Sequence, residues 1–116
     1  MSALFPLFVF EKDDHSMRMV ETPNRILYHM EAIDIENEGY VFWDSTGVGV
    51  AISAAKGAIA EIGVGTASMP LSEAFRMYAE SQGLQILLAG SPSEVWSRIQ
   101  AQLPKHESFW SRLFRR

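Results

Sequence analysis

Ala58-Ile59-Ala60-Glu61-Ile62-Gly63-Val64-Gly65 opens the stretch, ending at residue 103, that decides the fold. This octapeptide is short, rich in β-branched residues and closed by glycine, which predicts a strand. A helix is then expected over residues 70–82, a second strand over 84–89 and a second helix over 91–103. Strands that alternate with helices of this length predict a βαβ crossover in which the two strands are parallel.

The second helix begins with the clearest local signal in the chain. Ser91 can cap the helix, and Pro92 suits its first turn, where no backbone N–H is needed. Glu94 stands three residues after the cap and can reach back to the Ser91 N–H. Apolar residues recur every three or four positions in both helices, so these stripes are predicted to pack in the core.

The first half of the chain reads as two hairpins with a short helix between them. Strands are expected over residues 4–11 and 16–21, joined by an aspartate-rich turn, and again on both sides of residues 45–47. Thr22 and Pro23 predict the start of the short helix, with Thr22 as its cap. The four strands supply the antiparallel part of the sheet.

Residues 34–39 alternate acidic side chains before a glycine, as a calcium-binding loop does. Such a loop needs a bidentate glutamate at its twelfth position, which in this chain is Ser45. The segment is therefore predicted to be a turn, with Asn37 and Gly39 in the left-handed backbone conformation. No metal site is expected.

Together these elements predict an α+β fold with a mixed, mostly antiparallel sheet of about five or six strands. The sheet is built from the two hairpins and the C-terminal βαβα unit, with helices mainly on one face. Whether the strand that begins at Ala58 extends the second hairpin as a meander stays open. Residues 1–106 are expected to form a single domain, followed by a basic, aromatic tail or short helix at 107–116.

Composition excludes several classes of protein. A hydrophobic share of 47% and a charged share of 21% are ordinary for a globular chain, which argues against disorder. The absence of cysteine excludes disulfide frameworks, thiol nucleophiles and cysteine-based zinc sites. The apolar run at residues 3–10 is too short to span a bilayer and has no basic residue before it, so a cytoplasmic protein is expected.

Acidic residues concentrate in the first half of a chain whose formal net charge is −4. Nucleic-acid binding is not expected, because it needs a basic surface that displaces counterions. The favoured hypothesis is a non-enzymatic protein-binding domain, of an inhibitory or immunity-like kind, that meets a basic partner through this half. A merely solvated surface is the other interpretation. The expected partner-binding residues are Asp13, Asp14, Asp34, Glu36, Glu38 and Asp44.

No catalytic residue is predicted, and the sequence leans against an enzyme. The chain has neither a Gly-x-Ser-x-Gly elbow nor a Walker motif. Its three histidines, His15, His29 and His106, are expected in a turn, a short helix and the tail, without a neighbouring nucleophile. No cofactor is expected either.

Two other functions stay open. If the predicted βαβ strands are parallel, both following helices begin at one sheet edge, where free backbone N–H groups can bind phosphate or another small molecule. The anion-binding residues would then be Gly65, Thr66, Ser68, Gly90 and Ser91. The other hypothesis is a structural homodimer with an aromatic interface, whereas membrane binding by the tail is not expected. That interface would contain Trp43, Phe109, Trp110 and Phe114.

Overall fold

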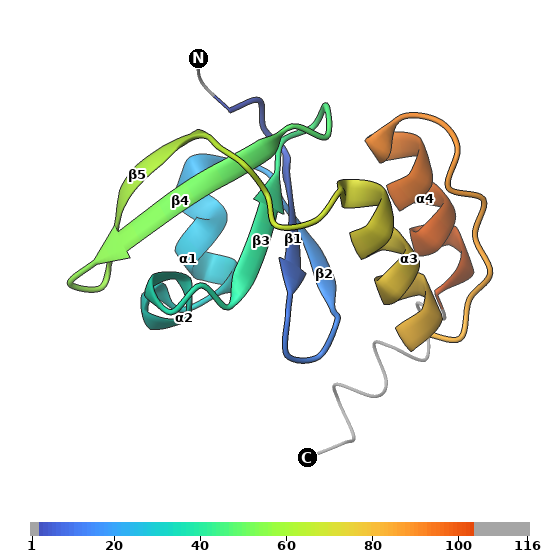
Figure 1. Cartoon of the computed structure of the whole chain (residues 1–116), viewed down its shortest axis with the longest axis horizontal. Helices are drawn as coiled ribbons and strands as arrows, with labels where there is room; N and C mark the ends of the chain where they lie inside the picture. Colours follow the sequence, from blue (N-terminus) through green and yellow to red (C-terminus); the bar gives the residue numbers. More distant parts are fainter. Residues whose placement is uncertain (1–2, 104–116) are drawn as a thin grey trace.

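A five-stranded antiparallel sheet organises the computed structural model, which describes residues 3–103 (Figure 1). The strand order is β2-β1-β3-β4-β5. This arrangement confirms the predicted α+β fold, and β5 pairs with β4, so it does extend the second hairpin as a meander. The strands are β1 (Leu7–Glu11), β2 (Met17–Val20), β3 (Tyr40–Trp43), β4 (Gly49–Ala55) and β5 (Ala58–Val64).

Helices cover both faces of this sheet. The two long ones, on one face, are α3 (Leu71–Ser81) and α4 (Pro92–Gln102). The short ones, on the other face, are η1 (Pro23–Arg25), α1 (Ile26–His29) and α2 (Ala32–Glu36). None of the helices in residues 3–103 is long and apolar enough to cross a membrane.

Alternating side chains of β1 supply the two halves of the core. Phe8 and Phe10 pack with Trp43 and with the buried stripes of α3 and α4. Leu7 and Val9 point the other way and pack with the apolar residues of the short helices. Successive residues of a strand point to opposite faces, so a strand buried on both faces needs apolar residues throughout. The sequence of β1, Leu-Phe-Val-Phe, meets that requirement.

Residues 84–89 do not form the predicted strand, and the described sheet contains no parallel pair. The expected βαβ unit is therefore wrong. The second strand does not form because Leu84, Ile86 and Leu88 pack onto the core cluster of α3 and α4 instead of reaching a sheet edge. From this position every second residue of the segment packs on the core, so these apolar residues are partly buried without a neighbouring strand.

The predicted start of α4 is confirmed in detail. The Ser91 hydroxyl accepts a hydrogen bond from the Glu94 N–H at 3.3 Å, and the Glu94 carboxylate accepts one from the Ser91 N–H at 2.9 Å. Thr22 stands at the start of η1 without a side-chain capping bond. The tail at 107–116, including Phe109, Trp110 and Phe114, lies outside the described residues.

Candidate functional site

Two acidic segments, distant in the sequence, meet at one end of the sheet. The first is the β1–β2 turn, and the second comprises α2 and its connection to β3 (Figure 1). The Lys12 N–H donates to the Gly39 carbonyl at 3.0 Å, and Glu11 is paired with Tyr40 in the sheet. The antiparallel pairing of β1 with β3 therefore holds the segments together. We define the acidic end as their carboxylates Asp13, Asp14, Asp34, Glu36 and Glu38.

All five carboxylates of the acidic end are exposed. The ion pairs within residues 3–103 join Glu11 to Arg18 and Arg76 to two glutamates of α3, and the His29 ring lies 3.6 Å from the Glu21 carboxylate. None of these pairs uses a residue of the acidic end. The described chain contains six Lys and Arg against thirteen Asp and Glu, a net charge of −7. The acidic end thus carries a concentrated negative charge without an ion-pair partner in the described chain.

Glu38 is held in a conformation that favours glycine. The helix α2 ends in a Schellman motif, in which the Gly39 N–H donates to the Asp34 carbonyl and the Glu38 N–H to the Ile35 carbonyl. Glu38 occupies the left-handed position of this motif, with φ of 56°. The prediction that Asn37 and Gly39 are left-handed is corrected, because this motif places the left-handed residue one position after the helix cap Asn37.

Behind the acidic end, one basic residue is already engaged. Arg18 forms a half-buried ion pair with Glu11 at 2.9 Å, and its guanidinium lies 6.0 Å from the centre of the Tyr40 ring. Burial raises the pKa of the Tyr40 phenol above its ordinary value, and the nearby Glu11 charge adds to this. Arg18 is therefore engaged by Glu11 and Tyr40, and no ion pair within residues 3–103 joins it to a carboxylate of the acidic end.

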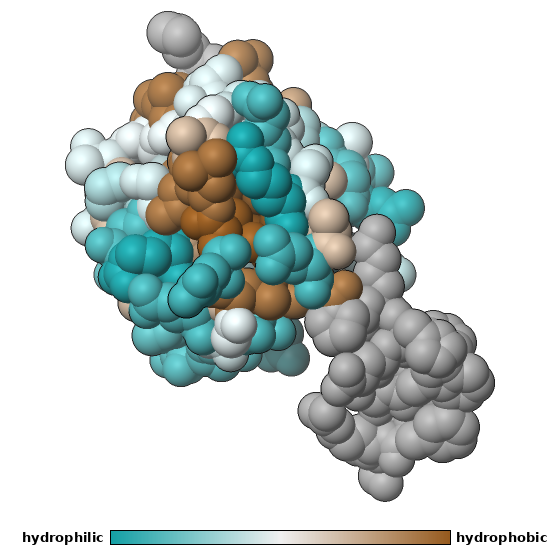
Figure 2. Space-filling model, turned by 90° about the vertical axis from the view of Figure 1, so that its right-hand side faces the viewer, coloured by the Kyte–Doolittle hydropathy of each residue, from teal (hydrophilic) through white to brown (hydrophobic). Residues whose placement is uncertain are grey.

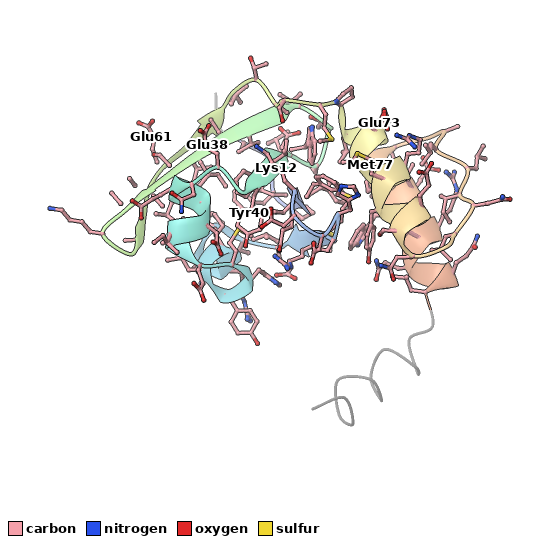
Figure 3. The ribbon with its side chains drawn as sticks, turned by 60° about the horizontal axis from the view of Figure 1, so that its bottom comes forward. Lys12, Glu38, Tyr40, Glu61, Glu73 and Met77 are labelled. Carbon is pink, nitrogen blue, oxygen red and sulfur yellow. The ribbon has the colours of Figure 1, made fainter. Side chains whose placement is uncertain are left out.

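A hollow lies beside the acidic end, where β3 and β4 separate. The two strands pair only through Phe42 with Val50 and Trp43 with Gly49. Beyond these pairs the strands diverge, and the hollow is lined by residues of both strands, of α2 and its connection to β3, and of segment 66–68, together with Lys12. Figure 3 shows Lys12, Glu38 and Tyr40 in this part of the molecule. The polar residues that line the hollow are Lys12, Glu38, Tyr40, Thr66 and Ser68.

Asp44 is not part of the acidic end, and its predicted role in partner binding is corrected. It lies at the opposite end of β3 and is 3% exposed. Its carboxylate accepts hydrogen bonds from the Thr46 N–H at 2.9 Å, the Thr46 hydroxyl at 2.6 Å and the Val48 N–H at 3.1 Å. Burial alone would raise the pKa of Asp44, but these hydrogen bonds outweigh it and lower the pKa below its ordinary value. Asp44 therefore fixes the β3–β4 turn.

Trp43 belongs to the core, so its predicted place in an interface is also corrected. The side chain is 1% exposed, and its indole N–H donates to the Met69 carbonyl at 3.1 Å. A tryptophan on a hairpin looks available to a partner from the sequence alone. Here α3 and the link that leads into it cover that face of the hairpin.

The predicted anion-binding residues do not share one site. Ser91 and Gly90 stand at the start of α4, where the Glu94 carboxylate already accepts the Ser91 N–H. The Gly65 N–H donates to the Gly49 carbonyl at 3.0 Å and so continues the ladder between β4 and β5. Thr66 and Ser68 line the hollow near Lys12 instead. The common sheet edge required two parallel strands, and the described sheet has none.

Sequence reasoning does not identify Lys12 or Tyr40, because the pairing of β1 with β3 brings them to the site. A correct prediction that β1 pairs with β3 would have found both residues, because Lys12 adjoins the aspartate turn and Tyr40 adjoins Gly39.

Within residues 3–103 no group of three or more histidine, aspartate and glutamate side chains is placed to hold a metal ion. Comparisons with protein-family models, curated proteins and solved structures found no match to this chain.

Proposed function

We propose that this chain is a non-enzymatic protein-binding domain that docks a basic protein through its acidic end, as inhibitory and immunity-like proteins do. The observation that supports the proposal is the convergence of five exposed carboxylates from two separate segments, none in an ion pair within the described chain. Clustered charge of one sign raises the rate of encounter with an oppositely charged partner and favours one orientation.

The backbone conformation of Glu38 supports the same proposal. A glutamate in the left-handed region costs stability of roughly 1 kcal/mol that glycine would not cost. Strained residues of this kind concentrate at binding and active sites, where the side chain serves a purpose beyond stability. At this position the glutamate keeps a negative charge next to the hydrogen bond between Lys12 and Gly39 that joins the two segments.

Backbone amide chemical shifts, recorded while an octa-arginine peptide is added, test this proposal. The peptide serves as a basic probe of defined chemistry. We expect the largest shifts at residues 12–15 and 34–40, and we expect them to disappear at high salt, because salt screens exposed charges beyond about 10 Å at 0.1 M. Shifts centred on another surface, or spread evenly over all acidic residues, contradict the proposal.

A second candidate function is the binding of a small anion in the hollow between β3 and β4. One observation favours it: Lys12, Thr66 and Ser68, two of them predicted as anion ligands, line the same hollow. Lysine and hydroxyl groups suit phosphate. Titration with inorganic phosphate separates the two functions, since anion binding should shift the amides of Thr66 and Ser68 and be lost in Lys12→Gln.

A further inference from the structure

The predicted strand at residues 84–89 is a run that returns from the end of α3 to the start of α4 (Figure 1). We name these residues the return segment. Its side chains alternate between partly buried and exposed, which is the period of a strand. Leu87, at its centre, is 68% exposed. The inward residues are Leu84, Ile86 and Leu88, and the outward ones are Gln85, Leu87 and Ala89.

The backbone of the return segment has few partners in the described chain. The Leu84 N–H donates to the Ala79 carbonyl at 2.8 Å. Arg98 of α4 donates to the carbonyls of Leu87 and Ala89 at 2.8 and 2.5 Å. No other hydrogen bond within residues 3–103 uses the backbone of residues 85–89. The backbone groups of Ile86 and Leu88 have no hydrogen-bond partner within residues 3–103, and in a strand these groups lie on the side opposite to the carbonyls of Leu87 and Ala89.

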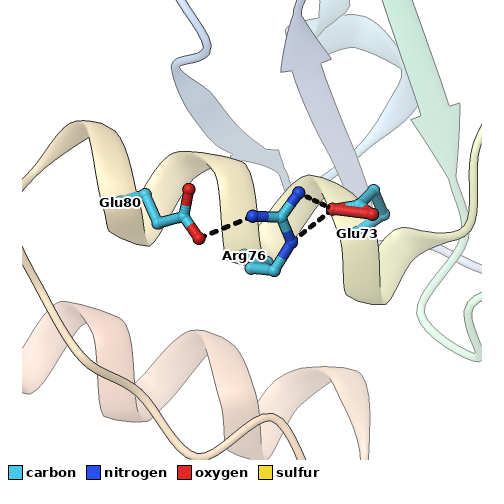
Figure 4. Close-up of polar contacts among 3 residues, drawn as sticks. All are labelled: Glu73, Arg76 and Glu80. Carbon is cyan, nitrogen blue, oxygen red and sulfur yellow. Dashed lines mark hydrogen bonds and ion pairs between the residues drawn. The ribbon is translucent and has the colours of Figure 1, made fainter.

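This free side of the return segment borders a groove. The groove lies between the segment and α3 and is lined by Arg76, Ala79 and Glu80 from the helix. Figure 2, which faces this side of the molecule, shows an apolar patch surrounded by hydrophilic residues. Arg76 pairs with both Glu73 and Glu80 along α3 (Figure 4), so these three rim residues carry one positive charge against two negative ones.

We propose that the return segment pairs with the return segment of a second copy of this chain, forming an antiparallel two-stranded ribbon. Unpaired strand edges recruit other strands, because main-chain hydrogen bonds supply the affinity. The return segment has no charged side chain, so two copies meet there without like-charge repulsion. Each described body carries a net charge of −7, counted from six basic and thirteen acidic residues, and this nearly neutral surface is where two such bodies can approach.

Other occupants fit this surface less well. A basic protein, the partner proposed for the acidic end, finds no complementary charge on the return segment.

Pairing of two copies through β5 is less favourable. The free edge of β5 carries Glu61 near its middle, and antiparallel pairing of two β5 strands would bring the two glutamates together. Self-pairing through the return segment avoids that conflict. It also goes beyond the proposed function, because it uses a different surface.

Two-fold pairing has a consequence that can be tested. A two-fold axis perpendicular to the ribbon keeps inward residues opposite inward residues and outward residues opposite outward ones. Leu87 of one copy therefore faces Gln85, Leu87 or Ala89 of the other. A charge at position 87 then meets the same charge in the second copy, whereas opposite charges in two different copies attract.

Light scattering on the full chain measures the mass of wild type, Leu87→Glu, Leu87→Lys and an equal mixture of the two variants. We expect a wild-type dimer, monomers for each variant alone, and a dimer in the mixture. Ile33→Glu is the matched control, because Ile33 is 60% exposed on α2, on the other face of the sheet, and this variant should stay dimeric. Amide exchange at residues 85–89 should slow in the dimer.

Three results overturn the proposal. A wild-type monomer with fast exchange at residues 85–89 shows that no strand pairs there. A dimer that survives both Leu87 variants places the interface elsewhere. The third result is a monomer in which the amides of residues 85–89 exchange slowly, but exchange fast in a chain that ends at Leu103. It would show that residues after Leu103 cover the return segment.

Discussion

The backbone N–H of Lys12 donates to the carbonyl oxygen of Gly39 at 3.0 Å, and this bond joins the two acidic segments of the chain. It extends the pairing of β1 with β3 by one step beyond Glu11 and Tyr40. The backbones of the two acidic segments are therefore joined directly at this bond, next to the last pair of β1 with β3. A rigid acidic surface loses less conformational entropy when a partner binds.

Replacing Glu38 by glycine should separate stability from binding. Glycine adopts the left-handed conformation at this position without steric cost, so Glu38→Gly should raise the free energy of unfolding by about 0.5–1 kcal/mol. The same change removes a charge from the acidic end and should weaken the binding of octa-arginine. Urea unfolding measures the first effect and peptide titration the second.

Glu38→Asp provides the control for that variant. Aspartate tolerates the left-handed region better than glutamate and keeps the charge, so this variant should bind as wild type does. If Glu38→Gly binds the peptide as tightly as Glu38→Asp does, the charge of Glu38 has no role in binding.

The buried carboxylate of Asp44 should make stability depend on pH. Its pKa is lowered in the folded protein by the hydrogen bonds from Thr46 and Val48. The resulting stability is fully present above the unfolded-state pKa of about 3.9 and is lost as the pH falls through the lower folded-state pKa. Asp44→Asn should cost about 1–2 kcal/mol at pH 7 and reduce the loss of stability below pH 4. Equal acid dependence in both proteins, from urea unfolding at each pH, would show that Asp44 does not contribute.

The Trp43 side chain should stabilise the fold both by its buried ring and by the hydrogen bond of its indole N–H. Trp43→Phe removes both ring volume and the hydrogen bond to the Met69 carbonyl, which joins β3 to the link before α3. We expect a loss of about 1–3 kcal/mol in the free energy of unfolding. The exposed Tyr28→Phe serves as a control and should change stability by less than about 0.5 kcal/mol. A loss as small as the control's would place Trp43 outside the core.

Local chemistry explains which elements the sequence predicts. The capping box of α4 depends on three neighbouring residues, Ser91, Pro92 and Glu94, and it forms as expected. The hairpin strands and the buried stripes of α3 and α4 follow from periodicity over short windows. The turn predicted over residues 34–39 begins inside α2, and its left-handed residue is Glu38 and not Asn37 or Gly39, because the Schellman geometry depends on where the helix stops.

Elements that depend on distant contacts could not be predicted in this way. The return segment has the composition and alternation of a strand, but whether it pairs depends on which sheet edge lies within its reach. Trp43 and Asp44 read as exposed residues of a hairpin, and only the packing of α3 and the Thr46 turn shows that they are buried. The sequence shows the carboxylates of the acidic end, and their role in binding stays a prediction, whereas only the pairing of β1 with β3 brings the two segments together.

The most direct test of the proposed function compares the affinity of octa-arginine for wild type and two variants of equal charge. One variant neutralises the acidic end with Asp13→Asn, Asp34→Asn, Glu36→Gln and Glu38→Gln. Asp14 is left in place because it accepts a hydrogen bond from the Ser16 N–H. The other variant neutralises four glutamates elsewhere, with Glu21→Gln, Glu61→Gln, Glu73→Gln and Glu80→Gln.

Calorimetric titration at low salt should show about a tenfold loss of affinity for the first variant, equivalent to about 1.4 kcal/mol. The second variant should bind within about twofold of wild type, because its glutamates lie outside the acidic end. Equal losses in both variants would show that only net charge attracts the peptide, and would contradict a binding surface at the acidic end.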